Sequence, residues 1–121
     1  MRIVTLQGLR VDVQNGVDID FVAELVDASR ARVQVARFAA GDSLAKHPAG
    51  MWQVFAIVSG DGYVAAYDDV RCVVRAGTAV IWEPGEHHTS WATTDMLVVI
   101  VQSVAEPHVP QPTVPVAPQP A

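Results

Sequence analysis

A chain of 121 residues, half of them hydrophobic and 17% charged, has the length and composition of one folded domain with a modest core. Its net charge of −5 and its lack of a basic run exclude the usual electrostatic signature of nucleic-acid or anionic-membrane binding. The longest apolar run, residues 96–101, is too short to span a bilayer. Because Cys72 is the only cysteine and residues 1–15 do not resemble a secretory signal, we expect a cytoplasmic location.

Short β-favouring runs recur along the chain and are separated by turn signals, which is typical of a β-sandwich or barrel. The segment 17–28 is ambiguous, because its apolar residues fit either an alternating strand or one face of a helix, and we expect the strand. Gly60-Asp61-Gly62 predicts a tight hairpin. The predicted strands are residues 2–6, 19–26, 31–38, 52–59, 63–67, 72–75, 79–82, 88–92 and 96–104.

The segment 51–59 is apolar on both faces if it is extended. Odd-numbered residues, including Gln53 and Phe55, face one way, and even-numbered residues, including Trp52 and Val54, face the other. One face fills the interior of a barrel, so the other needs cover from another sheet or from a second subunit. We expect a homodimer through that outer face.

Six prolines fall between Pro107 and Pro120, in a segment with almost no charge. We therefore expect one domain over residues 1–104 and an extended or disordered tail over residues 105–121. Pro112, Pro115 and Pro118 would align along one edge of a polyproline II helix, which could dock in an aromatic groove. An unstructured spacer is the more frequent explanation for such a segment.

Three of the four histidines lie beside turns, in Lys46-His47-Pro48 and in Glu86-His87-His88. From spacing alone, hydrogen-bonded core or surface histidines explain the sequence as well as metal ligands do. His47, Ala49 and Gln53 are separated by even numbers, so an extended chain would aim all three to one side. Imidazole nitrogen and amide oxygen are both acceptable metal donors.

The interval pattern around these residues resembles the first cupin motif, which reads glycine, five residues, histidine, one, histidine, three or four, glutamate, six, glycine. Here Gly41, His47, Ala49, Gln53 and Gly60 occupy the five positions, and every interval matches. Alanine replaces the second histidine, and glutamine replaces the glutamate.

A second stretch resembles the second cupin motif: glycine, five residues, proline, one, glycine, two, histidine, and in the stricter form three more and an asparagine. Gly77, Gly85 and His88 match it. Glu83 holds the proline position with Pro84 beside it, and Ala92 holds the asparagine position.

The resemblance implies an all-β fold, an antiparallel double-stranded β-helix or jelly-roll barrel that is often dimeric. It also implies a divalent metal held by three histidines and one glutamate, of which only His47 and His88 are matched here. An amide at residue 53 keeps an oxygen donor and loses the negative charge, and Ala49 offers no donor. We therefore expect any metal (Zn, Fe, Mn or Ni) to be weakly held by His47, Gln53 and His88. Glu86 is a possible substitute ligand, while His87 should point away.

Two functions follow from this resemblance. The first is binding of a small organic molecule in a pocket formed by His47, Gln53, Phe55, Trp82 and His88. The alternative is a metal-dependent enzyme of the dioxygenase or sugar isomerase and epimerase type, with water or substrate at the open metal positions. The ligand deficit favours binding, since a catalytic metal normally keeps at least three protein ligands. Trp91 could also line a pocket or simply pack in the barrel, and Cys72 is expected to be a small core residue.

Overall fold

The computed structural model describes residues 1–8, 19–110 and 118–121 of the chain, and these residues form strands and loops without any helix. No segment among them is therefore a helix long and apolar enough to cross a membrane. The strands are β1 (Arg2–Thr5), β2 (Gln7–Gly8), β3 (Asp20–Phe21), β4 (Ala31–Phe38), β5 (Ser43–Pro48), β6 (Trp52–Ser59), β7 (Asp61–Ala65), β8 (Cys72–Arg75), β9 (Thr78–Trp82), β10 (His87–Ala92) and β11 (Met96–Ser103).

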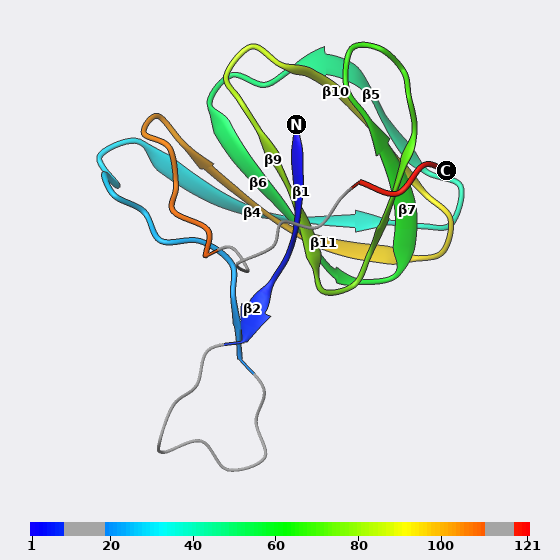
Figure 1. Cartoon of the computed structure of the whole chain (residues 1–121), viewed down its shortest axis with the longest axis horizontal. Helices are drawn as coiled ribbons and strands as arrows, with labels where there is room; N and C mark the ends of the chain where they lie inside the picture. The colour runs from blue at the N-terminus through cyan, green and yellow to red at the C-terminus, as the bar shows by residue number, and fades with distance from the viewer. Residues whose placement is uncertain (9–18, 111–117) are drawn as a thin grey trace.

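Two antiparallel sheets face each other and form the barrel (Figure 1). One is five-stranded in the order β1-β9-β6-β11-β4, and the other is four-stranded in the order β5-β10-β7-β8. A short third sheet pairs β2 with β3. The predicted all-β, antiparallel jelly-roll class is confirmed.

The barrel interior is filled by alternate residues of both sheets, since side chains alternate along a strand. Phe55 and Trp82 of the larger sheet and Val64 and Val74 of the smaller one are at most 2% exposed. Cys72 belongs to the same buried cluster, as expected. The interior is therefore closed by apolar packing over most of its length.

The outer face of the five-stranded sheet is also buried, and the same chain covers it. Val54 and Ala56 of β6 are fully buried, and Val22, Leu25 and Val109 pack over their cluster. An isolated bridge between Glu24 and His108 ties the two covering segments together. The reason for expecting a homodimer through this face therefore falls away, because no second subunit is needed to cover it.

Exposed apolar side chains remain at the edge of the same sheet. Val33 and Val35 of the edge strand β4 are 64% and 49% exposed, and Val58 of β6 is 51% exposed. A homodimer stays a prediction, and these valines are its candidate contacts.

The segments predicted as 31–38, 52–59 and 72–75 coincide with β4, β6 and β8. The strand predicted over 19–26 is wrong for most of its length. Only Asp20–Phe21 pairs in a sheet, because Val22, Ala23 and Leu25 pack as an irregular cover on the five-stranded sheet. Strand β5 was not predicted, since its six residues are all exposed and show no apolar alternation.

The packed domain continues beyond residue 104, where the tail was expected to begin. Pro107 and Val109 are buried against the barrel. At the C-terminus, Val73 N–H donates to Gln119 O over 2.9 Å, and Ala121 N–H donates to Arg71 O over 3.0 Å, so residues 118–121 run along the edge of β8 (Figure 1). Residues 111–117, and with them most of the predicted polyproline edge, lie outside the described residues.

The predicted hairpin at residues 60–62 joins β6 to β7. Gly60 has a φ of +86°, and a Cβ atom there would lie 2.1 Å from the Asp95 carbonyl oxygen. Glycine is required at this position both by the backbone conformation and by the close approach of the 94–95 turn.

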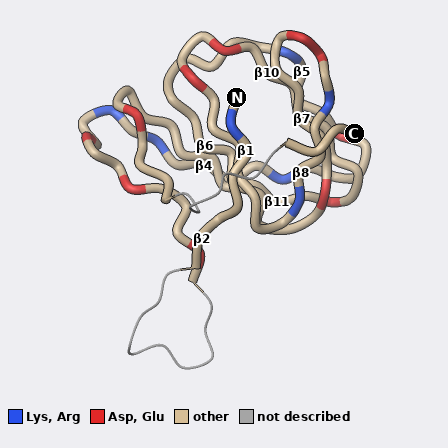
Figure 2. Tube along the Cα trace, viewed as in Figure 1, with Lys and Arg blue, Asp and Glu red and all other residues tan. Residues whose placement is uncertain are grey.

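Acidic and basic positions are interspersed along the described trace (Figure 2). This distribution agrees with the sequence, in which no basic run occurs. Along the described trace, basic residues do not form the continuous run that would favour a polyanion.

Candidate functional site

His47 and His88 lie directly opposite each other on β5 and β10. Directly opposite residues of paired strands share a face, and the two ring centroids are 4.3 Å apart. His87 points to the other side, where its ring contacts the exposed Tyr67 at 5.4 Å, as expected from alternation along the strand. Cross-strand pairing therefore brings together the two histidines that match the motifs.

Two turns hold this pair in register. Gly85 N–H donates to Ala49 O over 2.7 Å, and Ala49 N–H donates to Glu86 O over 2.9 Å. These bonds tie the turn after β5 to the turn before β10. Gly85 has a φ of +81°, which lets the chain reverse immediately before the His88 strand.

Backbone carbonyls fix the tautomer of both imidazoles. His47 Nδ1 lies 2.7 Å from Ala45 O, and His88 Nδ1 lies 3.2 Å from Glu86 O. A carbonyl oxygen can only accept, so each Nδ1 carries the proton and donates it. In the neutral rings each Nε2 then keeps its lone pair on the edge that faces away from the strand's own backbone.

Burial lowers the pKa of His88 below the usual 6.5, against the opposing effect of the Glu86 carbonyl. The nearby His47 lowers the pKa of His88 further. Only 4% of the His88 residue is exposed, whereas His47 stands at the exposed rim. Burial therefore disfavours the charged form of the His88 imidazole.

Trp82 packs against His88 in a stacked arrangement, with 4.7 Å between the ring centroids and 23° between the planes. The tryptophan is 1% exposed. Its indole Nε1–H has no hydrogen-bond partner among the described residues. A buried donor therefore lies on a ring in contact with the histidine pair.

Gln53 is next to Trp82 across the β6–β9 pairing, and next to Gln102 across the β6–β11 pairing. Gln53 is 5% exposed, and its Oε1 accepts a 3.0 Å hydrogen bond from Gln102 Nε2. The oxygen predicted as a metal donor is thus already engaged. Gln102 Oε1 has no partner among the described residues.

Sequence reasoning missed Gln102, although a signal was present. It is a polar residue that directly follows the apolar run 96–101 within the predicted strand 96–104. The strand register, which the sequence alone does not provide, then places it opposite Gln53. Ser90 of β10 was also missed, and its buried Oγ lacks a partner in the described part of the chain.

We predicted that His47, Ala49 and Gln53 share one side because they alternate along one extended segment, and this reason is wrong. Strand β5 ends at Pro48 and β6 begins at Trp52 in the other sheet, so alternation does not run through the turn between them. The three residues nevertheless belong to the same interior. Ala49 is buried in the interior cluster, and His47 and Gln53 face inward from opposite sheets.

Phe55 lies one inward position beyond Gln53 on β6 and is 2% exposed. Its ring contacts Phe38 edge to face at 6.3 Å. Phe55 therefore belongs to the apolar floor of the interior. Trp91, by contrast, packs under the Arg71 guanidinium at 4.1 Å and is opposite Tyr63, which places it away from the histidine pair.

The donor set does not fit a tightly held metal ion. Two imidazoles present a lone pair, Gln53 Oε1 accepts from Gln102, and Ala49 has no donor atom. The Glu86 carboxylate is engaged by the Met1 ammonium and by Glu83 N–H. No group of three or more His, Cys, Asp or Glu residues in the described part of the chain is arranged to hold a metal.

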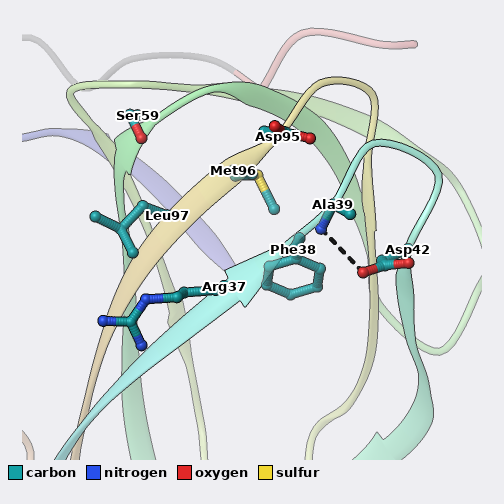
Figure 3. A pocket seen from close by; sticks show the side chains of 8 residues that line it. All are labelled: Arg37, Phe38, Ala39, Asp42, Ser59, Asp95, Met96 and Leu97. Carbon is teal, nitrogen blue, oxygen red and sulfur yellow. Dashed lines mark hydrogen bonds between the residues drawn. The ribbon is translucent and has the colours of Figure 1, made fainter.

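The opposite end of the barrel carries a hollow of about 510 Å³, lined by residues such as Arg37, Phe38 and Leu97 (Figure 3). Its carboxylates are occupied by backbone donors: Asp42 accepts from Ala39 N–H, and Asp95 accepts from Ala40 N–H. We call this the acid end, and the end with His47, His88, Trp82, Gln53 and Gln102 the histidine end. The carboxylates of the acid end hold turns in place.

The family model for the Cupin domain matches residues 34–103, which is more than half of the chain. The chain therefore belongs to the cupin family. No curated protein matches the sequence.

Solved structures share the fold at low sequence identity. A cupin superfamily protein from Desulfitobacterium hafniense is 12% identical with a TM-score of 0.59, and the match covers 87% of this chain and 100% of that one. A conserved protein of unknown function from Streptococcus pyogenes is 20% identical with a TM-score of 0.58, over 68% and 71% of the two chains. Salicylate 1,2-dioxygenase from Pseudaminobacter salicylatoxidans is 18% identical with a TM-score of 0.56, over 60% of this chain and 20% of that one. At these identities the likeness extends to the fold alone.

Proposed function

We propose that this cupin binds a small organic molecule at the histidine end of its barrel. The observation that carries the proposal is a pair of buried polar atoms there, Trp82 Nε1 and Gln102 Oε1, together with Ser90 Oγ two residues beyond His88 on β10. None of the three has a hydrogen-bond partner among the described residues. Each such atom costs about 1–3 kcal/mol when it has no partner, and a bound molecule that hydrogen-bonds to it recovers that cost.

The reduced metal site is part of the same proposal. His47, His88 and Gln53 form a poor donor set, so a divalent ion (Zn, Fe, Mn or Ni) binds weakly and is not needed for ligand binding.

A cytoplasmic location stays a prediction that rests on the single, buried Cys72.

The alternative function is a metal-dependent enzyme of the dioxygenase or sugar isomerase and epimerase type. One observation favours it. Backbone carbonyl groups hold the Nδ1 atoms of His47 and His88, and metal-binding histidines are commonly oriented by a carbonyl or carboxylate group in the same way. Two imidazoles still fall short of the three protein ligands that catalytic metals usually keep.

Two measurements on protein purified without an affinity tag or a chelator test the proposal. We expect elemental analysis to find metal far below one ion per chain. We also expect amide resonances of residues 85–90 to move in the presence of members of an organic fragment set, and this response to be lost in His88→Ala. Stoichiometric metal that disappears in His88→Ala would instead support the enzyme, and a fragment set that moves no resonance at this end would refute the binding function.

A further inference from the structure

The hydrogen-bonding atoms at the histidine end divide unequally into donors and acceptors. The acceptors are Nε2 of His47, Nε2 of His88 and Oε1 of Gln102. The one obligatory donor without a partner in the described residues is Trp82 Nε1–H, and Ser90 Oγ can act in either way. A complementary ligand must therefore both donate and accept hydrogen bonds.

The charged residues that face the interior also restrict the kind of ligand that fits. The inward-facing positions of the described strands carry no Asp or Glu, and their charged side chain is Arg32, at the exposed start of β4 opposite Gln102. The lone pairs of these acceptor atoms repel an anion. A neutral ligand suits this part of the barrel.

The stacking distance limits which chemical group fits. The centroids of the indole and imidazole rings are 4.7 Å apart and the rings are nearly parallel, so one small group can contact both rings. Carbonyl and carboxylate oxygens only accept, and an ammonium group only donates. A hydroxyl oxygen accepts from an N–H group and donates its own proton to a lone pair, so it satisfies both rings.

We propose that the ligand of the histidine end is a neutral, hydroxyl-bearing organic molecule, an alcohol or a phenol, that donates to the imidazole Nε2 atoms and accepts from the Trp82 indole. This inference rests on the proposed function and names the chemical class of its ligand. A metal ion alone would use the Nε2 lone pairs and leave the indole N–H without a partner, because an indole N–H cannot coordinate a cation.

The test compares phenol with anisole, which replaces the O–H proton by a methyl group, and with benzoate, which is an anion of similar size. Each is titrated into ¹⁵N-labelled protein with EDTA present, and the indole N–H signal of Trp82 and the Nε2 signal of His88 are followed. We expect phenol to move both signals and anisole to bind about tenfold more weakly, because methylation leaves buried acceptors without a donor. Benzoate should bind no better than anisole.

Two outcomes overturn the inference. Anisole binding as tightly as phenol would show that the hydroxyl proton is not used, and tighter binding of benzoate would show that Arg32 selects an anion. If phenol does not bind while a fragment without a hydroxyl group binds beside His88, the proposed function is supported and this inference is refuted. If no fragment binds, both fall.

Variants add an independent measurement. Trp82→Phe removes the indole N–H and should weaken phenol and anisole by similar factors, about tenfold, because both ligand oxygens accept from that group. Trp91→Phe is the matched control, since Trp91 packs with Arg71 away from the pair, and it should change neither affinity. If Trp82→Phe does not fold, Gln102→Met removes an acceptor at a partly exposed position and should weaken phenol selectively. An unchanged affinity of both ligands for Trp82→Phe, or equal losses for phenol and anisole in Gln102→Met, would contradict the inference.

Discussion

The two ends of the barrel use their polar side chains in opposite ways. At the acid end, Asp42 accepts a hydrogen bond from Ala39 N–H (Figure 3), and Asp95 accepts one from Ala40 N–H. At the histidine end, Trp82 Nε1 and Gln102 Oε1 are buried and have no partner among the described residues. Polar groups at the first end stabilise turns, and those at the second end keep hydrogen-bonding capacity that no described residue uses.

The hollow and the proposed binding site therefore lie at different ends of the barrel. The hollow at the acid end is open and has a volume of about 510 Å³, yet its carboxylates already have partners. We therefore expect changes at the acid end to alter stability with little effect on binding, and changes at the histidine end to alter binding more than stability.

The largest expected effect is on the stability of the acid end. Gly60→Ala places a Cβ atom 2.1 Å from Asp95 O at a φ of +86°. We expect it to lower the free energy of unfolding by more than about 3 kcal/mol or to prevent folding. Gly41→Ala is the control: its φ is +90° but no atom lies within 4 Å, so about 1 kcal/mol should be lost. Equal losses in urea unfolding would mean that the turn moves to accept the methyl group.

The second largest expected effect is a gain in metal affinity at the histidine end. The double variant Ala49→His with Gln53→Glu restores the two donors that the motif lacks. We expect it to bind Zn²⁺ at least about 100-fold more tightly than the wild type, because added ligands close the coordination shell. Calorimetric titration measures this gain. An unchanged affinity would mean that residues 49 and 53 do not point at the Nε2 atoms of His47 and His88.

A smaller effect is expected for the carboxylates of the acid end. Asp42→Ala removes the acceptor of Ala39 N–H and should cost about 1 kcal/mol in urea unfolding. Phenol affinity should be unchanged, because Asp42 and His88 lie at opposite ends of the barrel. A loss of binding that exceeds the loss of stability would remove the distinction between the two ends.

The smallest expected effect is on the pH dependence of the free energy of unfolding. The unfolded chain takes up a proton at the ordinary histidine pKa, whereas His88 in the folded chain does so only at lower pH. Its contribution to stability is therefore complete above the ordinary pKa and is lost as pH falls toward the folded pKa. We expect the drop in unfolding free energy between about pH 7.5 and pH 5.5 to shrink in His88→Gln. His87→Gln, which removes a histidine at the neighbouring position, should keep the wild-type drop; if both variants behave alike, the burial of His88 is not the cause.

The fold was predictable wherever one physical signal dominated. Alternating or continuous apolar residues defined β4, β6 and β8, and the hairpin glycine at Gly60 marked the turn between β6 and β7. Strand β5 was not predictable, because it is exposed throughout and pairs only through its backbone and His47. The covering segments around Val22 and Val109 were also missed, since their burial depends on a sheet face that is distant in sequence.

The candidate site was predictable in part. Motif spacing identified His47 and His88, and the pairing of β5 with β10 supplied the contact. Trp82 was recognised as a pocket candidate, but its stacking on His88 follows from the packing of two sheets. Gln102 became visible only through strand register, which joins it to Gln53 across 49 positions of sequence.

The most direct test of the account is a long-range ¹H–¹⁵N correlation spectrum of the imidazole rings at a pH where both are neutral. The account predicts that His47 and His88 both carry the proton on Nδ1 and leave Nε2 unprotonated, because Ala45 O and Glu86 O accept from Nδ1. A proton on Nε2 of either ring would contradict it, since the histidine end would then lack the paired acceptors on which ligand binding depends.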